Sequence, residues 1–471
     1  MAITFSADKQ RVRPLPSDPW EASRIDETSR RRRILEGRWE SDYDQWRVAE
    51  LGPTRDTLMG ARDLSRNFLL SFTGQLASLY DVRPTVTHPA GEFLLLIGAD
   101  LPNGKRDRGL LESGGLWAIM PRTQQFTLGL NEMIMSPEVR IIDGIPKVTF
   151  RPVFPDMIVA DADPDDPSRP VRVQELRDRP DPRAVGGEAW IWTWYKWDLT
   201  DLDHPVFAIW ACDNKGEPCE NITHLIFGEL DGDPQGFTGA GYPWRWASGR
   251  PYYPGVVYHR TWPATLWDPW AKREAVDGTL KLAVLWSYWA YTVKIGAHAQ
   301  KYIGGGEIET EVVQTTDQGG LRHAVSDPGA VLRIRQDETA TNLIIGQWGP
   351  AVDPLVLGQA IGAYEAGLAE NLGVRPGDLV RTSGDPRSGY ALAVSREGEL
   401  EERKRHAPIM QPSDELLIAM TAAAVNRAVG ADAFPEAGWV VEYDLQQSAL
   451  PTEAGPSNAP APPQTESSED P

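Results

Sequence analysis

The spacing of apolar residues predicts helices at the start of the chain and strands after them. Helices are expected over about 21–48 and 53–81. The second begins at Pro53, a favoured first helical position. It carries one apolar stripe, formed by Leu58, Ala61, Leu64, Phe68, Phe72, Leu76 and Leu79. From about 90 to 260, short apolar runs alternate with turn residues, which is typical of antiparallel strands.

Two local patterns in this β region are specific. Asp143-Gly144 lies between the apolar runs 139–142 and 145–148, and an Asp-Gly pair in that position predicts a tight β-hairpin. The run 190–197 consists mostly of aromatic residues, which favours a strand with aromatic side chains on both faces.

Two further long helices are expected around a small β module. Asp268-Pro269 is typical of a helix start, and the helix should continue to about 302. Its middle, 280–295, is apolar nearly all round, so it must be buried inside its own fold or against neighbouring subunits. Asp353-Pro354 repeats the start signal for a helix that ends at Gly373. We expect subunit contacts from both helices, at Leu282, Leu285, Trp286, Trp289, Leu357, Ile361, Tyr364 and Leu368.

Short β runs over 303–350 separate these helices, which predicts a stalk of two antiparallel helices with a β tip. A loop rich in glycine and proline follows, and then helices over about 388–405 and 413–429. Glu399–Arg403 and Glu401–Arg405 are spaced i,i+4, which favours a solvent-exposed helix. The arm 1–20 should be flexible, and the Pro-, Ser- and Glu-rich tail from 450 should be disordered.

Composition narrows the class of protein. The 471 residues are 41% hydrophobic with a net charge of −20, so a phosphate backbone would be repelled by most of the surface. Cys212 and Cys219 are too few for a disulfide scaffold and lack zinc-site spacing, which indicates free thiols. The N-terminus has no apolar signal segment, and the longest apolar stretch, 282–293, is too short to span a bilayer. We therefore expect a soluble chain made in a reducing cytoplasm.

Each catalytic or metal-binding motif that we tested is absent or lacks a residue that it requires. A phosphate loop at Gly104-Lys105 would need glycine where Ala99 stands and Ser or Thr where Arg106 stands. H-E-x-x-H and G-x-S-x-G are absent. Asp161, Asp163 and Asp165 alternate as in a calcium loop, but Asp166 and Arg172 occupy the positions that need Gly and Glu. We expect no enzyme activity, no metal and no cofactor.

Tryptophan is unusually frequent, with 18 residues in all and 12 of them between Trp190 and Trp289. One interpretation is a sugar-stacking platform, in which carboxylates such as Glu229 and Asp231 would act on a glycosidic bond. The other is that the tryptophans are anchors of the core and of subunit interfaces. The sequence leaves both open and favours the second.

Basic residues gather in two places. Arg30 to Arg33 form a run that Glu21, Asp26, Glu27, Glu36 and Glu40 nearly neutralise, which favours a solvated helix face over a nucleic-acid patch. Arg375, Arg381 and Arg387 are spaced along the glycine-rich loop, where they could touch phosphates or belong to an ordinary surface loop.

Several segments resemble tailed-phage portal proteins. Ser388-Gly389-Tyr390-Ala391-Leu392 is similar to the S-G-x-A-L stretch that enters a helix in that family, and the charged run 399–405 follows it. Asn371-Leu372-Gly373-Val374-Arg375-Pro376 resembles the helix end that precedes this stretch. Phe154-Pro155-Asp156-Met157, expected as a strand leading to Asp161, looks like part of the family's wing domain. The order of elements over about 50–430 matches as well.

The resemblance implies an α+β fold with a phage-portal-like architecture. After the arm would come a wing of helices and β strands (21–268), a first stem helix (269–302), a small α/β clip (303–350) and a second stem helix (353–373). A tunnel loop (374–388), a connecting helix (389–411), a helical crown (412–449) and the tail (450–471) would complete the chain.

The resemblance also implies the function of a head–tail connector of the siphophage type. The expected assembly is a ring, usually a dodecamer, at one capsid vertex of the virion, assembled in the host cytoplasm. Double-stranded DNA would pass through it without sequence specificity. The terminase large subunit, a head–tail adaptor, the major capsid protein and a scaffold would be partners, with no membrane involved. Arg375, Arg381 and Arg387 would lie nearest to DNA, and Arg403 and Lys404 would be candidates on a channel helix.

Two alternatives stay open at this point. One is the carbohydrate-binding protein or glycoside hydrolase built on the tryptophan-rich region. The other is a different virion structural protein, such as an adaptor or baseplate component, although these do not obviously need long paired helices.

Overall fold

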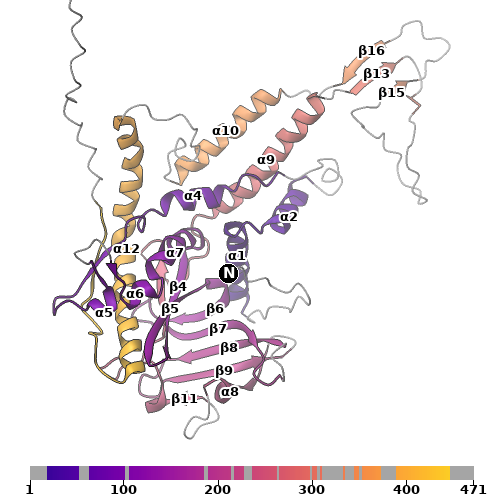
Figure 1. The fold of residues 1–471 in the computed structure, drawn as a ribbon. Coiled ribbons are helices and arrows are strands. Elements are labelled where there is room, and N and C mark those ends of the chain that lie inside the picture. The colour runs from indigo at the N-terminus through magenta and orange to yellow at the C-terminus, as the bar shows by residue number, and fades with distance from the viewer. Residues whose placement is uncertain are drawn as a thin grey trace, which may run out of the picture.

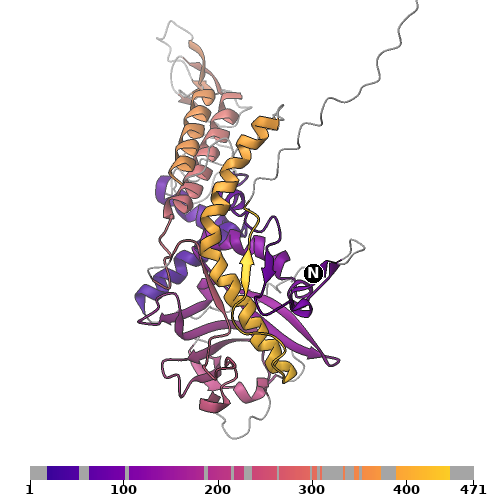
Figure 2. The ribbon, with the colours of Figure 1, turned by 90° about the vertical axis from the view of Figure 1, so that its left-hand side faces the viewer.

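A computed structural model describes residues 18–51, 63–100, 106–184, 189–213, 217–227, 236–262, 265–297, 300–304, 308–309, 332–334, 344–348, 353–372 and 389–445. Within them the fold is α+β, as expected, with mostly antiparallel sheets. A body of strands and short helices carries a pair of helices that projects from it, and a long helix runs along one side (Figures 1 and 2). The described helices include none that is long and apolar enough to cross a membrane.

The N-terminal helices are shorter than the apolar pattern predicts. The expected helix 21–48 is divided into α1 (Pro19–Leu35) and α2 (Glu40–Leu51), because Gly37 takes a positive φ of 73° and turns the chain. The expected helix 53–81 is reduced, in its described part, to α4 (Phe68–Leu76). The Asn67 side chain caps α4 by accepting a hydrogen bond from the Leu70 amide at 3.0 Å, so Leu64 precedes the helix. Leu58 and Ala61 lie outside the described residues.

One sheet is built on the predicted hairpin. β4 (Glu132–Ile142) pairs with β5 (Ile145–Val153) on one side and with β12 (Val256–His259) on the other. Asp143 and Gly144 form the connection with φ values of 54° and 75°. Positive φ at both central residues is what a type I′ turn requires, so the Asp-Gly prediction is confirmed.

The second sheet holds the aromatic run. Its strands are β6 (Ile158–Ala162), β7 (Pro170–Pro180), β8 (Trp190–Asp198), β9 (Val206–Cys212) and β10 (Pro218–Asn221), in the order β10-β9-β8-β7-β6, and β11 (Phe237–Thr238) pairs with β9. The strand predicted at 190–197 is therefore confirmed. The segment 154–157 is not a strand, because Pro155–Met157 forms the short 3-10 helix η1 that leads into β6.

Smaller elements complete the body. They are β1 (Thr85–Thr87), α5 (Leu94–Ile97), β2 (Ala99–Asp100), β3 (Arg106–Asp107), α6 (Leu110–Ser113), α7 (Leu116–Leu130), α8 (Thr223–Phe227), η2 (Gly239–Gly241) and β17 (Val440–Glu442). β1 pairs with β17, so the C-terminal strand returns to the N-terminal third of the chain.

The C-terminal helices are one element. α12 runs from Gly389 to Val429 without a break, where two helices were expected over 388–405 and 413–429. Pro408 and Pro412 lie inside it, and each removes a backbone hydrogen-bond donor. Packing against the first sheet holds the helix together there, since Ala407 and Met410 are buried and the Ser413 hydroxyl donates to the Val257 carbonyl at 3.1 Å.

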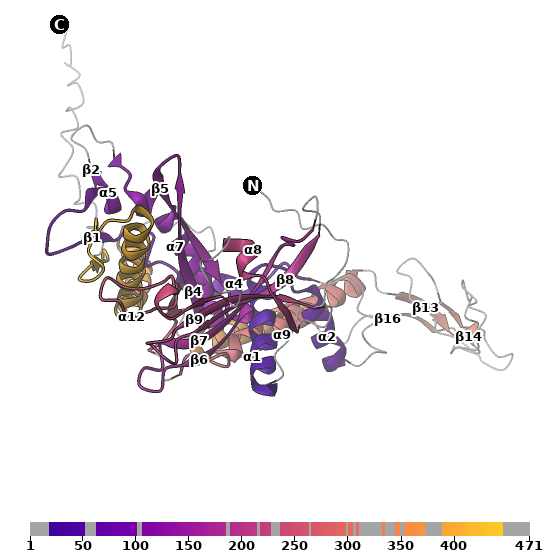
Figure 3. The ribbon, with the colours of Figure 1, turned by 90° about the horizontal axis from the view of Figure 1, so that it is seen from below.

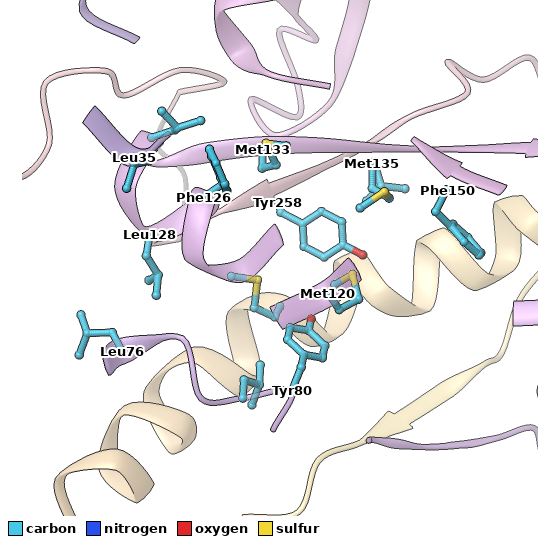
Figure 4. Packing of buried hydrophobic residues seen from close by; sticks show 14 of the residues in the cluster. Leu35, Leu76, Tyr80, Met120, Phe126, Leu128, Met133, Met135, Phe150 and Tyr258 are labelled. Atoms are coloured by element: carbon cyan, nitrogen blue, oxygen red, sulfur yellow. The ribbon is translucent and has the colours of Figure 1, made fainter. Parts of the chain in front are cut away.

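The main core lies between the first sheet, the N-terminal helices and α12. Leu35, Phe126, Leu128, Met133, Met135, Phe150 and Tyr258 are buried there with Met120, Leu76 and Tyr80 (Figure 4). A second cluster covers the aromatic sheet and contains Tyr195, Trp197, Phe207 and Tyr253.

The arginines of α1 are structural, which corrects the expectation of a solvated face. Arg31 is 1% exposed, pairs with Glu27 at 3.0 Å and donates to the Gly129 carbonyl at 3.3 Å. Arg32 lies over the Phe154 ring at 3.8 Å, and Arg33 pairs with Asp42 at 2.6 Å. These contacts connect α1 to α7, to the segment that leads into the second sheet, and to α2. The arginines therefore join α1 to its neighbouring elements.

A buried carboxylate joins segments that are distant in the sequence. Asp414 on α12 accepts hydrogen bonds from the hydroxyls of Tyr443 at 2.6 Å, Tyr258 at 2.7 Å and Tyr80 at 2.9 Å. Burial raises the pKa of Asp414 to about 6, although the three hydrogen bonds lower it. One side chain thus ties α12 to β12, to the segment after α4 and to the C-terminal strand.

Replacing Asp414 should destabilise the fold strongly. Asp414→Ala leaves three buried hydroxyls without their acceptor, and each such group costs about 1–3 kcal/mol. We expect a clear fall of the thermal midpoint, measured by calorimetry, and a much smaller fall in Tyr443→Phe, which removes one donor. Equal midpoints in the two variants would contradict this role.

Glu132 should make stability depend on pH. It is buried, accepts from the Asp268 amide at 2.6 Å, and burial raises its pKa from 4.5 to about 8. Because the native state holds this proton more tightly than the unfolded state, its stabilising contribution is full below about pH 4.5 and is lost as pH rises through about 8. Glu132→Gln keeps the acceptor and removes the titration. Its thermal midpoint should fall less than the wild-type midpoint between pH 6 and 8, whereas the exposed Glu274→Gln should follow wild type.

Candidate subunit interface on the helical stalk

The projecting pair consists of α9 (Arg273–Ala297) and α10 (Pro354–Asn371), called the stalk below. The two helices lie side by side, and the strands β13 (Gln300–Gly304), β15 (Leu332–Ile334) and β16 (Ile344–Trp348) lie at the far end (Figure 1). With β14 (Ile308–Glu309), they form one sheet in the order β14-β15-β13-β16. The described parts therefore contain a β module at the tip of a helical pair.

The Asp-Pro pair predicted the start of α10 correctly and the start of α9 wrongly. Asp353 caps α10 by accepting from the Leu355 amide at 2.8 Å, as predicted. Asp268 does not cap α9. The Asp-Pro pair predicts Pro269 as the first helical residue, but α9 begins four residues later, at Arg273. The Asp268 amide instead donates to Glu132, and Lys272 takes a positive φ of 55° just before the helix.

The two helices approach closely at glycines. A Cβ atom at Gly278 of α9 would collide with Cδ2 of Leu368 on α10. A Cβ atom at Gly358 of α10 would lie 3.1 Å from the indole nitrogen of Trp289 on α9. That nitrogen donates to the Pro354 carbonyl at 3.0 Å. Helix crossing at glycines lets large side chains of one helix fit against the backbone of the other.

Polar contacts fasten the stalk to the body at its base. The Ser287 hydroxyl of α9 lies 2.7 Å from the Tyr43 hydroxyl of α2 and accepts from the Asp63 amide at 3.0 Å. Arg66 lies over the Trp286 ring at 4.0 Å and pairs with Glu365 of α10 at 3.3 Å. The segment before α4 therefore contacts both stalk helices.

The eight predicted interface residues fall into two groups. Leu282, Ile361 and Leu368 are buried in this chain's own core. Leu285, Trp286, Trp289, Leu357 and Tyr364 are partly buried and pack against the edge of that core. The stripe predicted from spacing is thus mainly the inner face, along which the stalk helices meet each other and the body.

The outer face of α10 is uncharged and carries exposed apolar residues, and the eight predicted interface residues did not include it. Leu355 is 68% exposed and Val356 58% exposed. The other exposed residues between them and Leu368 are Gln359, Ala360, Gly362 and Ala363, so none is charged. Val293 of α9 is also exposed. The signal was present in the sequence, since the run Leu355-Val356-Leu357 puts apolar side chains on more than one side of a helix.

The DNA-channel candidates are only partly described. Arg375, Arg381 and Arg387 lie outside the described residues, as does the whole expected tunnel loop. Arg403 of α12 pairs with Asp81 at 3.1 Å, so its charge is engaged within the subunit. Lys404 is exposed.

The tryptophan-rich region does not form a row for stacking sugars in its described part. Trp194, Trp197 and Trp267 are buried, and the Trp197 ring lies 5.1 Å from Tyr253 and 5.2 Å from Phe207. The exposed tryptophans of this region, Trp190, Trp262 and Trp270, come from three separate segments. Most of these side chains are anchors of the core. Glu229 and Asp231 lie outside the described residues.

The acidic cluster forms ion pairs within its own turn. Asp161 pairs with Arg172 at 2.9 Å and Asp163 with Arg169 at 3.3 Å. Among the described residues, no group of three or more His, Cys, Asp or Glu side chains is placed to hold a metal ion. Both cysteines are free thiols, as predicted, and burial raises the pKa of Cys212 to about 12.

Comparisons with known proteins assign no family. No protein-family model and no curated protein matches the chain. Among solved structures, a chain from the virion of a native gene transfer agent particle matches with a TM-score of 0.36 and 12% identity, over 83% of this chain and 88% of that chain. At this TM-score the likeness establishes neither a shared fold nor a shared function.

The glycine contact between the stalk helices predicts a coupled pair of substitutions. Gly278→Ala should lower the thermal midpoint, because the new methyl group collides with Leu368. Leu368→Ala should also lower it by emptying part of the core. In the double variant the loss should be smaller than the sum of the two single losses, since Leu368→Ala removes the obstacle. A strictly additive result would contradict the contact.

Proposed function

We propose that this chain is the portal protein of a phage-like particle, a structural subunit without enzymatic activity. Subunits form a ring, most simply a dodecamer, at one vertex of the capsid. Double-stranded DNA enters and leaves through the channel of the ring. In its most general form, the proposal is that the chain is a structural component of a virion.

The observation that carries the proposal is the outer face of α10. The helix projects from the body, packs one side on α9, and leaves an uncharged side with Leu355 and Val356 exposed. Adjacent exposed apolar residues on an uncharged helix face favour a protein–protein contact. In a ring of identical subunits, the outer face of one stalk packs against the stalk of the next subunit, which removes it from water.

The remaining architecture supports the same role. The β module at the tip of the stalk is separated from the body, so it can serve as a docking surface for the terminase large subunit during packaging and for a head–tail adaptor afterwards. The body with its two sheets and α12 would contact the major capsid protein and the scaffold. A body, a pair of helices and a β module at their tip follow one another along the described chain, which supports the assignment of wing, stem and clip.

Electrostatics also fit a conduit. The net charge of −20 repels a phosphate backbone, so DNA can slide through the ring without sticking. The arginines of α1 do not oppose this, because they are used in ion pairs and ring contacts inside the subunit. Arg375, Arg381 and Arg387 remain the residues proposed to lie nearest to DNA.

The exposed face of the stalk predicts that the chain is oligomeric and that charged substitutions on this face disrupt the oligomer. Purified chain should form particles many times the mass of one 52.2 kDa subunit, with a central channel visible by electron microscopy. The double variant Leu355→Asp/Val356→Asp should dissociate, because charges at the centre of an interface are desolvated without partners. Light scattering over a concentration series measures the shift toward monomer.

The matched control is Leu225→Asp, an exposed apolar residue of α8 in the body, which should assemble like wild type. Wild-type chain that stays monomeric at every concentration, also in the presence of scaffold, would refute the ring. Unchanged assembly of the double variant would remove α10 from the interface.

A further inference from the structure

A cavity with aromatic and proline walls lies between α12, β12 and the loops at 166–170 and 246–262. Its volume is about 400 Å³, within the usual range of ligand sites, about 300–1,000 Å³. Trp262 keeps 76% of its surface exposed, and Leu416 is exposed as well. The rings and prolines of the walls include Trp246, Tyr252, Trp262, Pro170, Pro251 and Pro412. The described chain therefore leaves an aromatic cavity partly open to water.

Polar side chains line the same cavity, and two of them are arginines. Arg250 is exposed and forms no ion pair with any described residue. Arg169 donates to Asp163 at 3.3 Å. Asp166 is the acidic residue of the walls, and its Oδ1 accepts from the amide and the hydroxyl of Ser168 at 3.1 and 2.6 Å. The cavity thus suits an occupant that is apolar and also carries hydrogen-bond acceptors.

A proline-rich segment has this chemistry. Proline has no backbone N–H, so such a segment favours the extended polyproline II conformation, in which the backbone carbonyls accept no hydrogen bond from the segment itself. Grooves lined by aromatic side chains bind segments of this kind. Mixed walls of tryptophan, tyrosine, proline and arginine are therefore what a proline-rich occupant requires.

The sequence contains such a segment beyond the last described residue, Leu445. It is Pro460-Ala461-Pro462-Pro463, called the proline tract below. The surrounding range 446–471 contains no lysine or arginine, and its acidic residues are Glu453, Glu466, Glu469 and Asp470. Acidic residues on both sides of the tract favour a cavity that offers Arg250.

The tract can reach the cavity of its own chain. The Tyr443 hydroxyl donates to Asp414 of α12 at 2.6 Å, so the described chain stops beside the helix that forms one wall. Asp414 and Leu416 are two positions apart on this helix and therefore lie on nearly opposite sides of it. Residues 446–459 span up to about 45 Å when extended, whereas a helix with its side chains is about 10–12 Å across. The connection is long enough to pass around α12.

We propose that the proline tract binds in this cavity of the same chain. The prolines pack against Trp246 and Trp262, and their carbonyls accept hydrogen bonds from Arg250. Binding covers the most exposed of the tryptophans and holds the segment after the last strand against α12. The inference does not rest on the proposed ring, because one chain carries both the tract and the cavity.

Disulfide trapping tests the contact in the full chain. In a Cys212→Ser/Cys219→Ser background, Ala461→Cys in the tract is combined with Leu416→Cys at the cavity and oxidised with diamide. Mass spectrometry should find an internal bond between the two cysteines. The bond should form about tenfold faster than in the matched pair Ala461→Cys/Leu202→Cys, because bound groups have a high effective concentration. Leu202 of the β8–β9 loop is a fair control, since it is 40% exposed and Leu416 is 41% exposed.

The outcomes separate this inference from the proposed function. Equal rates for the two pairs would overturn the binding of the tract, whether or not rings form. Covalent multimers in place of the internal bond would overturn the assignment to the same chain. A fast internal bond in a chain that stays monomeric would support the inference while the proposed ring fails.

A second measurement does not depend on cysteine chemistry. Pro460→Gly/Pro462→Gly/Pro463→Gly removes the preference for polyproline II and leaves the described residues untouched. Backbone amides of 246–258 should then exchange hydrogen about threefold faster or more, because the cavity has lost its occupant. The control Pro451→Gly/Pro471→Gly changes prolines outside the tract and should exchange like wild type. Equal exchange in the tract variant and wild type would overturn the inference.

Discussion

The architecture depends on one constraint: each apolar face of a helix must be covered. α10 meets this constraint only in part within one chain. Its inner face packs on α9 where Gly278 and Gly358 allow close approach, and its outer face keeps Leu355 and Val356 exposed. Hydrophobic burial is roughly proportional to area, so the uncovered side leaves a driving force for association. The ring proposed here uses that driving force.

The body that carries the stalk is held by buried and partly buried polar groups. Arg31 and Arg33 of α1 pair with Glu27 and Asp42, and Asp414 binds three phenols from separate segments. Such contacts are strict about geometry, because a buried polar group that loses its partner is costly. Arg66 and Ser287 connect the stalk to the N-terminal region in which Arg31 and Arg33 lie. A rigid base is what a subunit needs if every copy must meet its neighbour at the same angle.

Local rules predicted the local structure well. Asp143-Gly144 predicted the hairpin and its turn, and Asp353-Pro354 predicted the start of α10, because both signals act within a few residues. The errors came where tertiary contacts override such signals. Asp268 does not cap α9 because the helix begins only at Arg273, after Lys272 takes a positive φ, and α12 continues through Pro408 and Pro412 because the first sheet supports it. The arginine run has the composition of a solvated face, and only the positions of Phe154, Asp42 and Gly129 in space show that it joins α1 to its neighbours.

The sequence by itself determined the elements of the stalk, the aromatic strand, the hairpin and the acidic charge, since periodicity, turn chemistry and composition act along the chain. It did not determine which face of an apolar helix remains exposed. That decision belongs to the tertiary structure, because exposure depends on what the rest of the chain places against each face. Leu282, Ile361 and Leu368 therefore proved to be core, whereas Leu355 and Val356, next to them in the same pattern, face solvent.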